Sequence, residues 1–471
     1  MKLSVPAFPI APSVARGIFA GLCLLLSGVA LAIHVPGHLS VDSTIQLHEA
    51  FLGQAISWAP PLMSAILAWL GFGTISTSLF VLLNVAMTYG GFMLAAGSRM
   101  DAPWSGWRLG VACVLAANPV VFTYVGIVWK DVLLASMCTL SFGSCVAAYR
   151  SRDSRMRFML LVLAMVTLLP TPMVRQQAIF LMPVAALSPA WMLLRLAPPE
   201  RRKRAGIGIF AACVVFYVLL QAAVAHTVPP AADGGVSKTG GSISVGTRIL
   251  MAYDIAGIEA GVDSEGPMAK AGAPRNIVEE AQREYGADRV DHLLGEKLKI
   301  GGYFAGLGND GVRRLWFDAV LSEPLSYIVH RLDVYAWLIG LRPVSRCLPF
   351  HVGVDGIDGY MRESGFRQEL ELRDAALFSW NQKFVASPIW RHWLYLAALG
   401  LLGAISWHRR RSARPALMPW FAGLGLFALS FLPTSIACDF RYLYVMLPTT
   451  MALAIFLLAP NPPGVDLRHR G

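Results

Sequence analysis

Charged residues are scarce in this chain. Only 15% of its 471 residues are Asp, Glu, Lys or Arg, whereas 55% are hydrophobic. A typical soluble domain has roughly a quarter charged residues. The shortage of charge excludes an ordinary soluble globule, and the excess of apolar residues predicts a membrane protein.

Cysteine is also sparse, and the patterns in which it usually carries chemistry are missing. The seven cysteines include no CxxC pair and no paired metal-ligand spacing, which argues against zinc and dithiol redox sites. Most fall inside apolar runs, where we expect them to be small packing residues. Spacing alone cannot establish a disulfide between Cys347 and Cys438, so we expect free thiols.

The chain also lacks a Walker motif and a long-period repeat. The glycine-rich stretch 234–246 contains a lysine, but it does not have the spacing of a phosphate-binding loop. No self-similar unit of solenoid length is visible. These absences argue against P-loop nucleotide chemistry and against a repeat architecture.

Long apolar runs dominate what is present. About ten runs reach the roughly 17 to 25 residues that a transmembrane helix needs. They lie near residues 17–35, 75–97, 106–125, 131–149, 157–173, 176–195, 206–226, 389–407, 416–436 and 441–460. The predicted fold class is an all-α polytopic membrane protein with about ten transmembrane helices.

The net charge of +11 comes largely from arginine clusters that recur along the chain. The clusters lie at Arg99 and Arg108, 150–157, 201–204, 409–414 and 468–470, which are alternate loops. By the positive-inside rule, both termini then face the cytoplasm, and the charge does not call for a nucleic-acid partner. Ala30-Leu31-Ala32 would also suit signal-peptide cleavage, but the apolar run before it is long for a signal peptide.

Two stretches between the predicted spans are conspicuous, and both fall on the external side. The first external loop covers about 35–74, and a larger region covers 227–388. We therefore divide the chain into an N-terminal transmembrane module (1–226), an external, mainly helical region (227–388) and a C-terminal transmembrane module (389–471). In the larger region, the apolar periodicity predicts helices at 276–299 and 323–339.

The first external loop contains a Pro60-Pro61 pair that precedes a short apolar segment. This segment has about a dozen apolar residues, which are too few to cross a bilayer comfortably. If it did cross, the later arginine clusters would fall outside. We therefore predict a juxtamembrane or re-entrant helix.

Polar side chains gather at the outer ends of the predicted spans. They come from four separate loops and comprise Asp42, His48 and Glu49, then Trp129-Lys130-Asp131, then Arg175, and finally Asp439 with Arg441-Tyr442. A carboxylate that faces cations at a bilayer surface suits an enzyme that activates a hydroxyl and stabilises an anionic leaving group, for which phosphate is the obvious candidate.

Each of these side chains also has a simpler interpretation. Asp42 would serve as the N-cap of a helix that begins near Ser43. Lys130, Arg175 and Arg441 would anchor helix ends at the membrane interface. Their coincidence on one side of the membrane favours a shared site over one cap and three unrelated anchors.

The candidate metal ligands are His34, His38 and Asp42, which are spaced by four residues. Continuous helix would align them on one face. Pro36 and Gly37 interrupt that helix, so we assign no metal ligands. No cofactor is assigned, and a divalent metal is the open alternative.

Taken together, these motifs resemble the GT-C superfamily of integral-membrane glycosyltransferases. The resemblance rests on Asp42, Trp58-Ala59-Pro60-Pro61-Leu62, Trp129-Lys130-Asp131, Arg175 and Arg441-Tyr442. It extends over roughly 17–226, with weaker support at 389–460. One departure is Ala59, because family members often have His or Lys immediately before the Pro-Pro pair.

The resemblance implies a sugar donor linked to polyprenyl phosphate or pyrophosphate. It implies that Asp42 is the catalytic carboxylate, with Asp131 as a second acidic residue. Lys130, Arg175 and Arg441 would bind the phosphate leaving group, and His48 and Glu49 would support the site. The reaction would invert the anomeric centre.

The function predicted is therefore a bacterial inner-membrane glycosyltransferase that acts at the periplasmic face. Its partners would be the lipid-linked donor, membrane lipids and an envelope glycan, lipid or protein acceptor. A lipid-linked glycan ligase or polymerase is an alternative, as is a lipid or glycan transporter. Transporters, however, usually place charges near the bilayer midplane in repeated halves, which this sequence lacks.

Overall fold

The architecture was obtained as a computed structural model that describes residues 9–57, 59–97, 104–231, 245–262, 265–294, 298–368, 370–409 and 411–459. Within these ranges the secondary structure is almost wholly helical. The strands β1 (Pro9–Ile10) and β2 (Trp104–Ser105) form one short antiparallel pair. The predicted all-α class is therefore confirmed.

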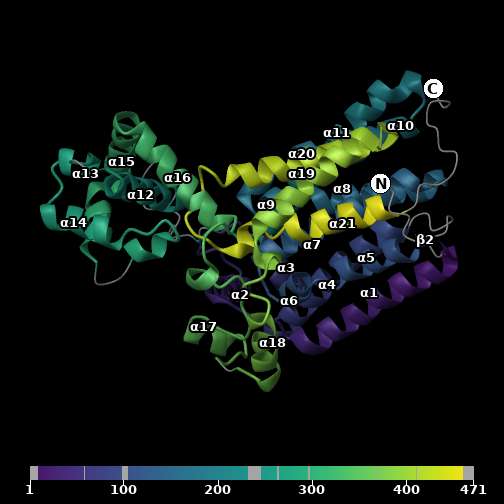
Figure 1. Cartoon of the computed structure of the whole chain (residues 1–471), viewed down its shortest axis with the longest axis horizontal. Helices are drawn as coiled ribbons and strands as arrows, with labels where there is room; N and C mark the ends of the chain where they lie inside the picture. The colour runs from purple at the N-terminus through teal and green to yellow at the C-terminus, as the bar shows by residue number, and fades with distance from the viewer. Residues whose placement is uncertain are drawn as a thin grey trace, which may run out of the picture.

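A bundle of long helices forms the body of the molecule (Figure 1). Its members are α1 (Pro12–His34), α4 (Gly73–Gly97), α5 (Gly106–Ala116), α6 (Pro119–Tyr124), α7 (Lys130–Arg150), α8 (Ser154–Leu168), α9 (Thr171–Val174), α10 (Met182–Leu196), α11 (Arg202–Thr227), α19 (His392–Arg409), α20 (Arg414–Ser430) and α21 (Met446–Leu458).

The described residues include seven helical stretches that are long and apolar enough to cross a membrane. They correspond to α1, α4, α5 with α6, α7, α8 with α9, α11 with the turn before it, and α21 with the turn before it. These stretches indicate a membrane protein with several spans. The other three predicted spans coincide with the shorter helices α10, α19 and α20, which have 15, 18 and 17 residues.

The first external loop folds into the helices α2 (Val41–Leu52) and α3 (Leu62–Leu70). The helix α3 begins directly after Pro61 and has only nine residues, as expected for a segment that does not cross a bilayer. Trp58 lies outside the described residues, as do Arg99, Arg410, the C-terminal Arg468 and Arg470 and most of the glycine-rich stretch.

Beyond one end of the bundle lies a second set of helices (Figure 1). They are α12 (Val245–Ala260), α13 (Pro267–Lys270), α14 (Arg275–Glu284), α15 (Lys299–Ser322), α16 (Pro324–Leu338), α17 (Asp358–Glu363) and α18 (Leu372–Gln382). Side chains between Tyr253 and Val334 form a hydrophobic core of their own. Buried residues from Leu338 to Phe366 instead join the core of the bundle.

One predicted helix in this region is wrong. The segment 276–299 was expected to be continuous, but α14 ends at Glu284, and only a 3-10 turn (Val290–Leu293) precedes the start of α15 at Lys299. Tyr285, which follows α14, has an extended backbone, with a ψ of 134°. The predicted helix at 323–339 does form, as α16 with Pro324 in its first turn.

Arg150 ties the far end of the bundle together. Its side chain is buried, and its guanidinium donates to the carbonyl oxygens of Ala95 on α4 (3.3 Å) and Phe456 on α21 (2.8 Å). Carbonyls in the last turn of a helix have no partner within the helix. One residue of a predicted cytoplasmic cluster therefore joins three helix ends instead of facing solvent.

Close packing between α4 and α7 depends on two glycines. A Cβ atom at Gly91 would lie 2.6 Å from the carbonyl oxygen of Thr139, and a Cβ atom at Gly143 would lie 2.4 Å from the carbonyl oxygen of Gly91. Such distances are shorter than van der Waals contact. Small residues allow helix backbones to approach closely in membranes, where dispersion contacts supply much of the association energy.

We predict that Gly91→Ala destabilises the protein by about 1–3 kcal/mol, because the added methyl forces α4 away from α7. The neighbouring Gly90→Ala is the matched control, since a Cβ atom there meets nothing within 4 Å. Thermal unfolding in detergent compares the two variants. Equal stability of Gly91→Ala and Gly90→Ala would contradict the close-packing explanation.

Candidate functional site

Short extended segments hold the first external loop against two distant parts of the chain. His38 and Ile127 form a parallel bridge, as do Leu39 and Val354. The backbone N–H of Val128 donates to the carbonyl of His38 at 2.9 Å, and the N–H of Asp355 donates to the carbonyl of Leu39 at 2.8 Å. The start of α2 therefore has a fixed position relative to α7 and to the external region.

The helix α2 is capped by Ser40 and not by Asp42. The backbone N–H of Ser40 donates to Ser43 Oγ at 3.2 Å, and the two side chains form a capping box. The indole N–H of Trp129 also donates to Ser40 Oγ at 2.7 Å. Asp42 lies in the first turn of α2, so its carboxylate is not committed to the cap that the sequence suggested as an alternative.

Asp42 instead forms an ion pair with Arg441. The Arg441 Nη1 atom lies 2.5 Å from Asp42 Oδ2, and its Nη2 atom lies 3.2 Å from Asp439 Oδ2. Asp439 is in turn 3.7 Å from the guanidinium of Arg289. Charges of alternating sign therefore run from the external region through the 435–441 loop to α2.

Burial by itself would raise the pKa of the Asp42 carboxyl. The cations of Arg441, Lys130 and Arg175, together with the hydrogen bond from Arg441, outweigh burial and hold the pKa below its usual range. Three basic side chains from separate loops thus act on one carboxylate. The Asp42 side chain nevertheless keeps 49% of its surface exposed, against 19% for Arg441.

Asp131 and Arg175 form a second, more deeply buried pair. Their side chains are 2% and 8% exposed, and Arg175 Nη1 donates to Asp131 Oδ1. The Arg175 guanidinium also lies over the rings of Tyr442 (4.5 Å) and Phe431 (5.0 Å). Such cation–π contacts add attraction in a desolvated setting. Arg175 Nε and Asp131 Oδ2 are buried and lack a hydrogen-bond partner.

Aromatic rings frame the two arginines. The Arg441 guanidinium lies 5.1 Å from the ring of Trp129, the residue that precedes Lys130. Tyr442 stacks on Phe431 with a centroid separation of 5.8 Å. Lys130 begins α7, one residue before Asp131. The site is therefore a cationic cluster with aromatic walls and one half-exposed carboxylate.

Glu49 and His48 serve the scaffold of this site. Glu49 is buried and accepts hydrogen bonds from the backbone N–H groups of Ile56 (2.9 Å) and Ser57 (2.6 Å) and from Ser64 Oγ (2.6 Å). His48 pairs with Glu363 of α17 and stacks on Tyr360. Both residues were predicted to support substrate binding, whereas their contacts hold α2 against α3 and α17.

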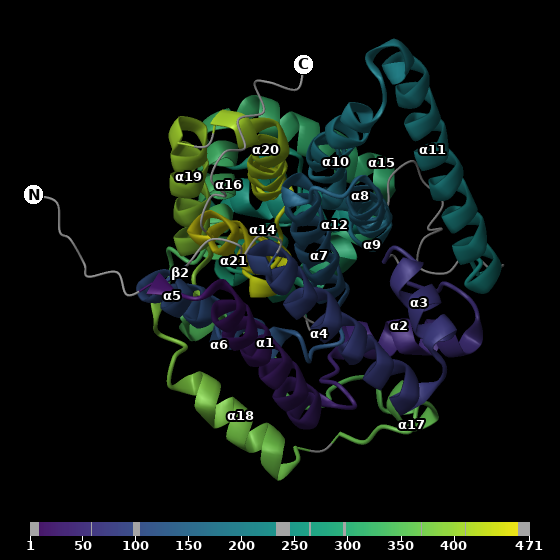
Figure 2. The ribbon, with the colours of Figure 1, turned by 90° about the vertical axis from the view of Figure 1, so that its right-hand side faces the viewer.

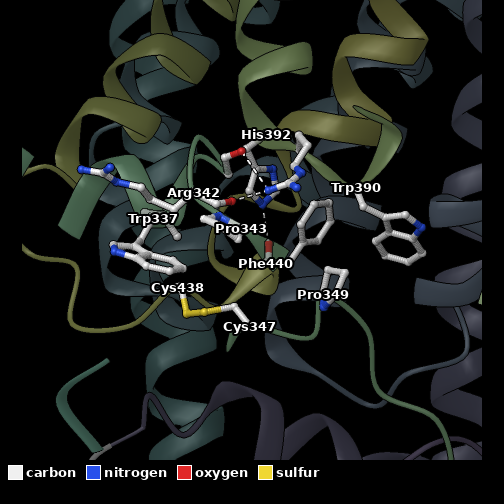
Figure 3. A pocket seen from close by; sticks show the side chains of 12 residues that line it. Trp337, Arg342, Pro343, Cys347, Pro349, Trp390, His392, Cys438 and Phe440 are labelled. Atoms are coloured by element: carbon white, nitrogen blue, oxygen red, sulfur yellow. Dashed lines mark hydrogen bonds between the residues drawn. A yellow bond between two sulfur atoms is a disulfide. The ribbon is translucent and has the colours of Figure 1, made fainter. Parts of the chain in front are cut away.

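The 435–441 loop, which carries Asp439 and Arg441, is held from several sides. Cys438 forms a disulfide with Cys347, so the expectation of free thiols at these positions was wrong. The Cys438 N–H donates to the carbonyl of Asp288 at 2.8 Å. Figure 3 shows the disulfide beside Phe440, whose carbonyl accepts a hydrogen bond of 2.7 Å from His392 Nε2.

The external core contributes another tether to this loop. Arg331, Asp254 and His330 are buried together, and Arg331 Nη1 donates to the carbonyl of Ser435 at 2.7 Å. The Val290 N–H donates to the carbonyl of Ile436 at 2.8 Å. The external region therefore positions the loop that presents Arg441 to Asp42.

Sequence reasoning did not assign a role to Arg289, nor to Asp439 beyond its external position. Asp439 stands two residues from Arg441, which was a usable signal. Arg289 had none, because its distance from Asp439 in the sequence conceals the contact. Arg289 pairs with Asp439, and Asp439 in turn pairs with Arg441. Arg441 therefore contacts two carboxylates, those of Asp42 and Asp439.

The histidines considered as metal ligands pair with each other. His34 ends α1 and His38 follows the Val35-Pro36 cis bond, so Asp42 is not on their helical face. His34 Nδ1 lies 2.8 Å from His38 Nε2. Within the described part of the chain, no three His, Cys, Asp or Glu side chains are arranged to hold a metal ion.

Comparison of the chain with protein-family models, with curated proteins and with solved structures finds no match.

We predict that Glu49→Gln lowers stability by about 1–3 kcal/mol, because an amide nitrogen cannot accept from the buried donors that now reach the carboxylate. Asp358→Asn, which changes an exposed carboxylate on α17, is the control, and its stability change should be small. Thermal unfolding in detergent separates these outcomes, and a stable Glu49→Gln protein would return Glu49 to the candidate binding residues.

Proposed function

We propose that the protein is a membrane glycosyltransferase of the GT-C type that uses a polyprenyl-phosphate-linked sugar as donor. The observation that carries the proposal is the Asp42–Arg441 pair, with Lys130 and Arg175 also acting on Asp42. A carboxylate can activate a hydroxyl group. Cations held nearby can stabilise the phosphate that leaves.

The proposed reaction is a single displacement. The acceptor oxygen attacks the anomeric carbon of the donor sugar while the bond from that carbon to the phosphate oxygen breaks. The electron pair of this bond leaves with the lipid phosphate, and the acceptor proton goes to Asp42. Displacement from the opposite side inverts the anomeric centre. Lys130, Arg175 and Arg441 offset the charge that develops on the phosphate.

The ion pair between Arg441 and Asp42 sets the order of donor binding and acceptor activation in this scheme. In the resting protein its guanidinium holds the Asp42 carboxylate and keeps the pKa of Asp42 low, and so strong an acid makes a weak base. A donor phosphate competes for the same guanidinium. Once the phosphate takes Arg441, the pKa of Asp42 rises and the carboxylate becomes a better base. Acceptor activation therefore follows donor binding.

Asp131 has a different role in this scheme from the one expected of a second catalytic acid. It is almost completely buried and is paired with Arg175. Its negative charge allows the Arg175 guanidinium to remain charged in a desolvated place. We therefore treat Asp131 as a positioning residue for Arg175, which in turn binds phosphate.

The membrane arrangement that we propose has ten spans. Besides the seven long apolar stretches, α10, α19 and α20 lie along the bundle (Figure 1). The 17 or 18 residues of α20 and α19 span about 26 Å, close to the hydrocarbon thickness. The 15 residues of α10 span about 23 Å, and the 3-10 turn Gln176–Ile179 before α10 lengthens this segment. The end with α12 to α16 would be periplasmic. The Cys347–Cys438 disulfide agrees with this side, because disulfides persist in oxidising compartments.

A ligase or polymerase that transfers a longer glycan would use the same site chemistry, and the size of the product separates it from a single-sugar transferase. The charges of the site lie at the ends of α7 and α9 and just before α21. A transporter usually has its binding site near the bilayer midplane, so the enzyme hypothesis is favoured over transport.

We predict that Asp42→Asn lowers sugar transfer at least about 100-fold, the usual contribution of a general base, with normal expression. The measurement uses purified protein in proteoliposomes, a polyprenyl-phosphate sugar donor and envelope extract as acceptor. Asp358→Asn, which changes an exposed carboxylate on α17, controls for surface charge. Full transfer by Asp42→Asn would end the proposal.

The pH dependence gives a second measurement. A base works above its pKa, and kcat/KM for the donor reports the free enzyme, so the acid limb of kcat/KM should lie below the ordinary Asp range in wild-type protein. Arg441→Gln removes the closest cation, which raises the pKa of Asp42 and should move the acid limb to higher pH. Arg204→Gln, at the opposite end of the bundle, is the control. An acid limb that does not move in Arg441→Gln would exclude Asp42 as the titrating group.

A further inference from the structure

The helix α11 differs from every other long helix of the bundle. In an apolar 18-residue stretch of α11 and the turn before it, only 6% of the residues are buried, whereas 89% are buried in the corresponding stretch of α7. Figure 2 shows α11 standing apart from its neighbours. Its outward residues are strongly apolar, with Phe210 71% exposed and Leu219 64% exposed. So large an exposed apolar surface is typical of a helix that contacts lipid or another protein.

The rest of the protein holds α11 mainly at its two ends. At the start, a Cβ atom at Gly206 would touch Leu194 of α10 at 3.4 Å. At the other end, the indole N–H of Trp69 on α3 donates to Thr227 Oγ1 at 2.9 Å. The Ala55 N–H also donates to the carbonyl of Pro229 at 2.8 Å. Between these attachments, most of the α11 side chains are exposed.

One face of α11 is nevertheless directed toward the bundle. Its half-buried side chains recur at three- and four-residue spacing and end at a buried valine, in the series Ile209, Cys213, Phe216, Leu220 and Val224. This spacing defines a single helical face. The face is apolar from end to end, so it suits a hydrocarbon chain.

The outer end of this face leads toward the cationic cluster. The helix α3 packs against α11 and also against α9, which ends next to Arg175. The same helix contacts α2 through the hydrogen bond from Ser64 to Glu49. Arg175 is only 7% exposed, and its buried Nε atom has no hydrogen-bond partner. A buried donor of this kind fits an anionic ligand.

We propose that the hydrocarbon tail of a lipid phosphate lies between α11 and the body of the bundle, with its phosphate directed past α3 to Arg175. The apolar face of α11 and the basic cluster match the two halves of such a molecule. This inference rests on the proposed function, because that function supplies the lipid phosphate. It adds the lateral path by which the lipid reaches the site.

Photo-crosslinking from α11 tests the proposal directly. Phe216 lies on the half-buried face and Phe210 on the exposed face, so replacing each with benzoylphenylalanine gives a matched pair. The probe is tagged long-chain polyprenyl phosphate in nanodiscs. We expect Phe216 to give about tenfold more adduct than Phe210, which corresponds to a modest site preference. Unlabelled polyprenyl phosphate should compete, and polyprenol without phosphate should not.

The outcomes distinguish the inference from the function on which it rests. If wild-type protein does not bind the probe at all, the proposed lipid-phosphate substrate is wrong, and the inference falls with it. If the probe binds but labels both positions equally and without competition, only the α11 path is wrong. An adduct to a second copy of the chain would show that this face is a protein interface instead.

A substitution offers an independent measurement. Cys213→Trp fills the half-buried face of α11, whereas Phe210→Trp enlarges only the exposed face. We expect Cys213→Trp to raise the KM for a long-chain donor about tenfold, with little change for a short-chain analogue. Phe210→Trp should leave both values unchanged. An equal rise in KM for both donors in Cys213→Trp, with thermal unfolding unchanged from wild type, would contradict the path.

Discussion

The arrangement of the site depends on how the charge of Arg441 is compensated. Its guanidinium is mostly removed from water, and a charge in such a place is costly unless it is paired and hydrogen-bonded. Asp42 and Asp439 share this task. Because Asp42 comes from α2 and Asp439 from the 435–441 loop, one cation joins the beginning of the chain to its last span.

This constraint gives the external region a structural purpose. The 435–441 loop would not hold Arg441 between two carboxylates unless its own backbone were fixed. The disulfide to Cys347, the backbone bonds to Asp288 and Val290 and the bond from Arg331 to Ser435 all fix it. The core formed by α12 to α16 therefore acts on the site through the loop.

Much of the framework followed from the sequence, because hydrophobic length and arginine placement are local signals. They predicted the apolar stretches, the short helix after Pro61 and the common side of Asp42, Lys130, Arg175 and Arg441. The disulfide, the Arg289–Asp439 contact and the structural use of Glu49 were not predictable, because each depends on how distant loops meet. The helix expected at 276–299 failed for a related reason. Apolar spacing continues beyond Glu284, whereas the backbone at Tyr285 is extended.

The two carboxylate–arginine pairs differ in burial, and burial determines which pair a ligand can separate. Asp131 and Arg175 are both deeply buried, so separating them would leave an unpaired charge in a low-dielectric place, which costs about 3–5 kcal/mol. Asp42 is half-exposed, and water can solvate its carboxylate when Arg441 turns to another anion. In the proposed reaction, a phosphate would therefore add to Arg175 without breaking its pair, whereas it would exchange with Asp42 at Arg441. The proposed order of donor first and acceptor second follows from this difference in burial.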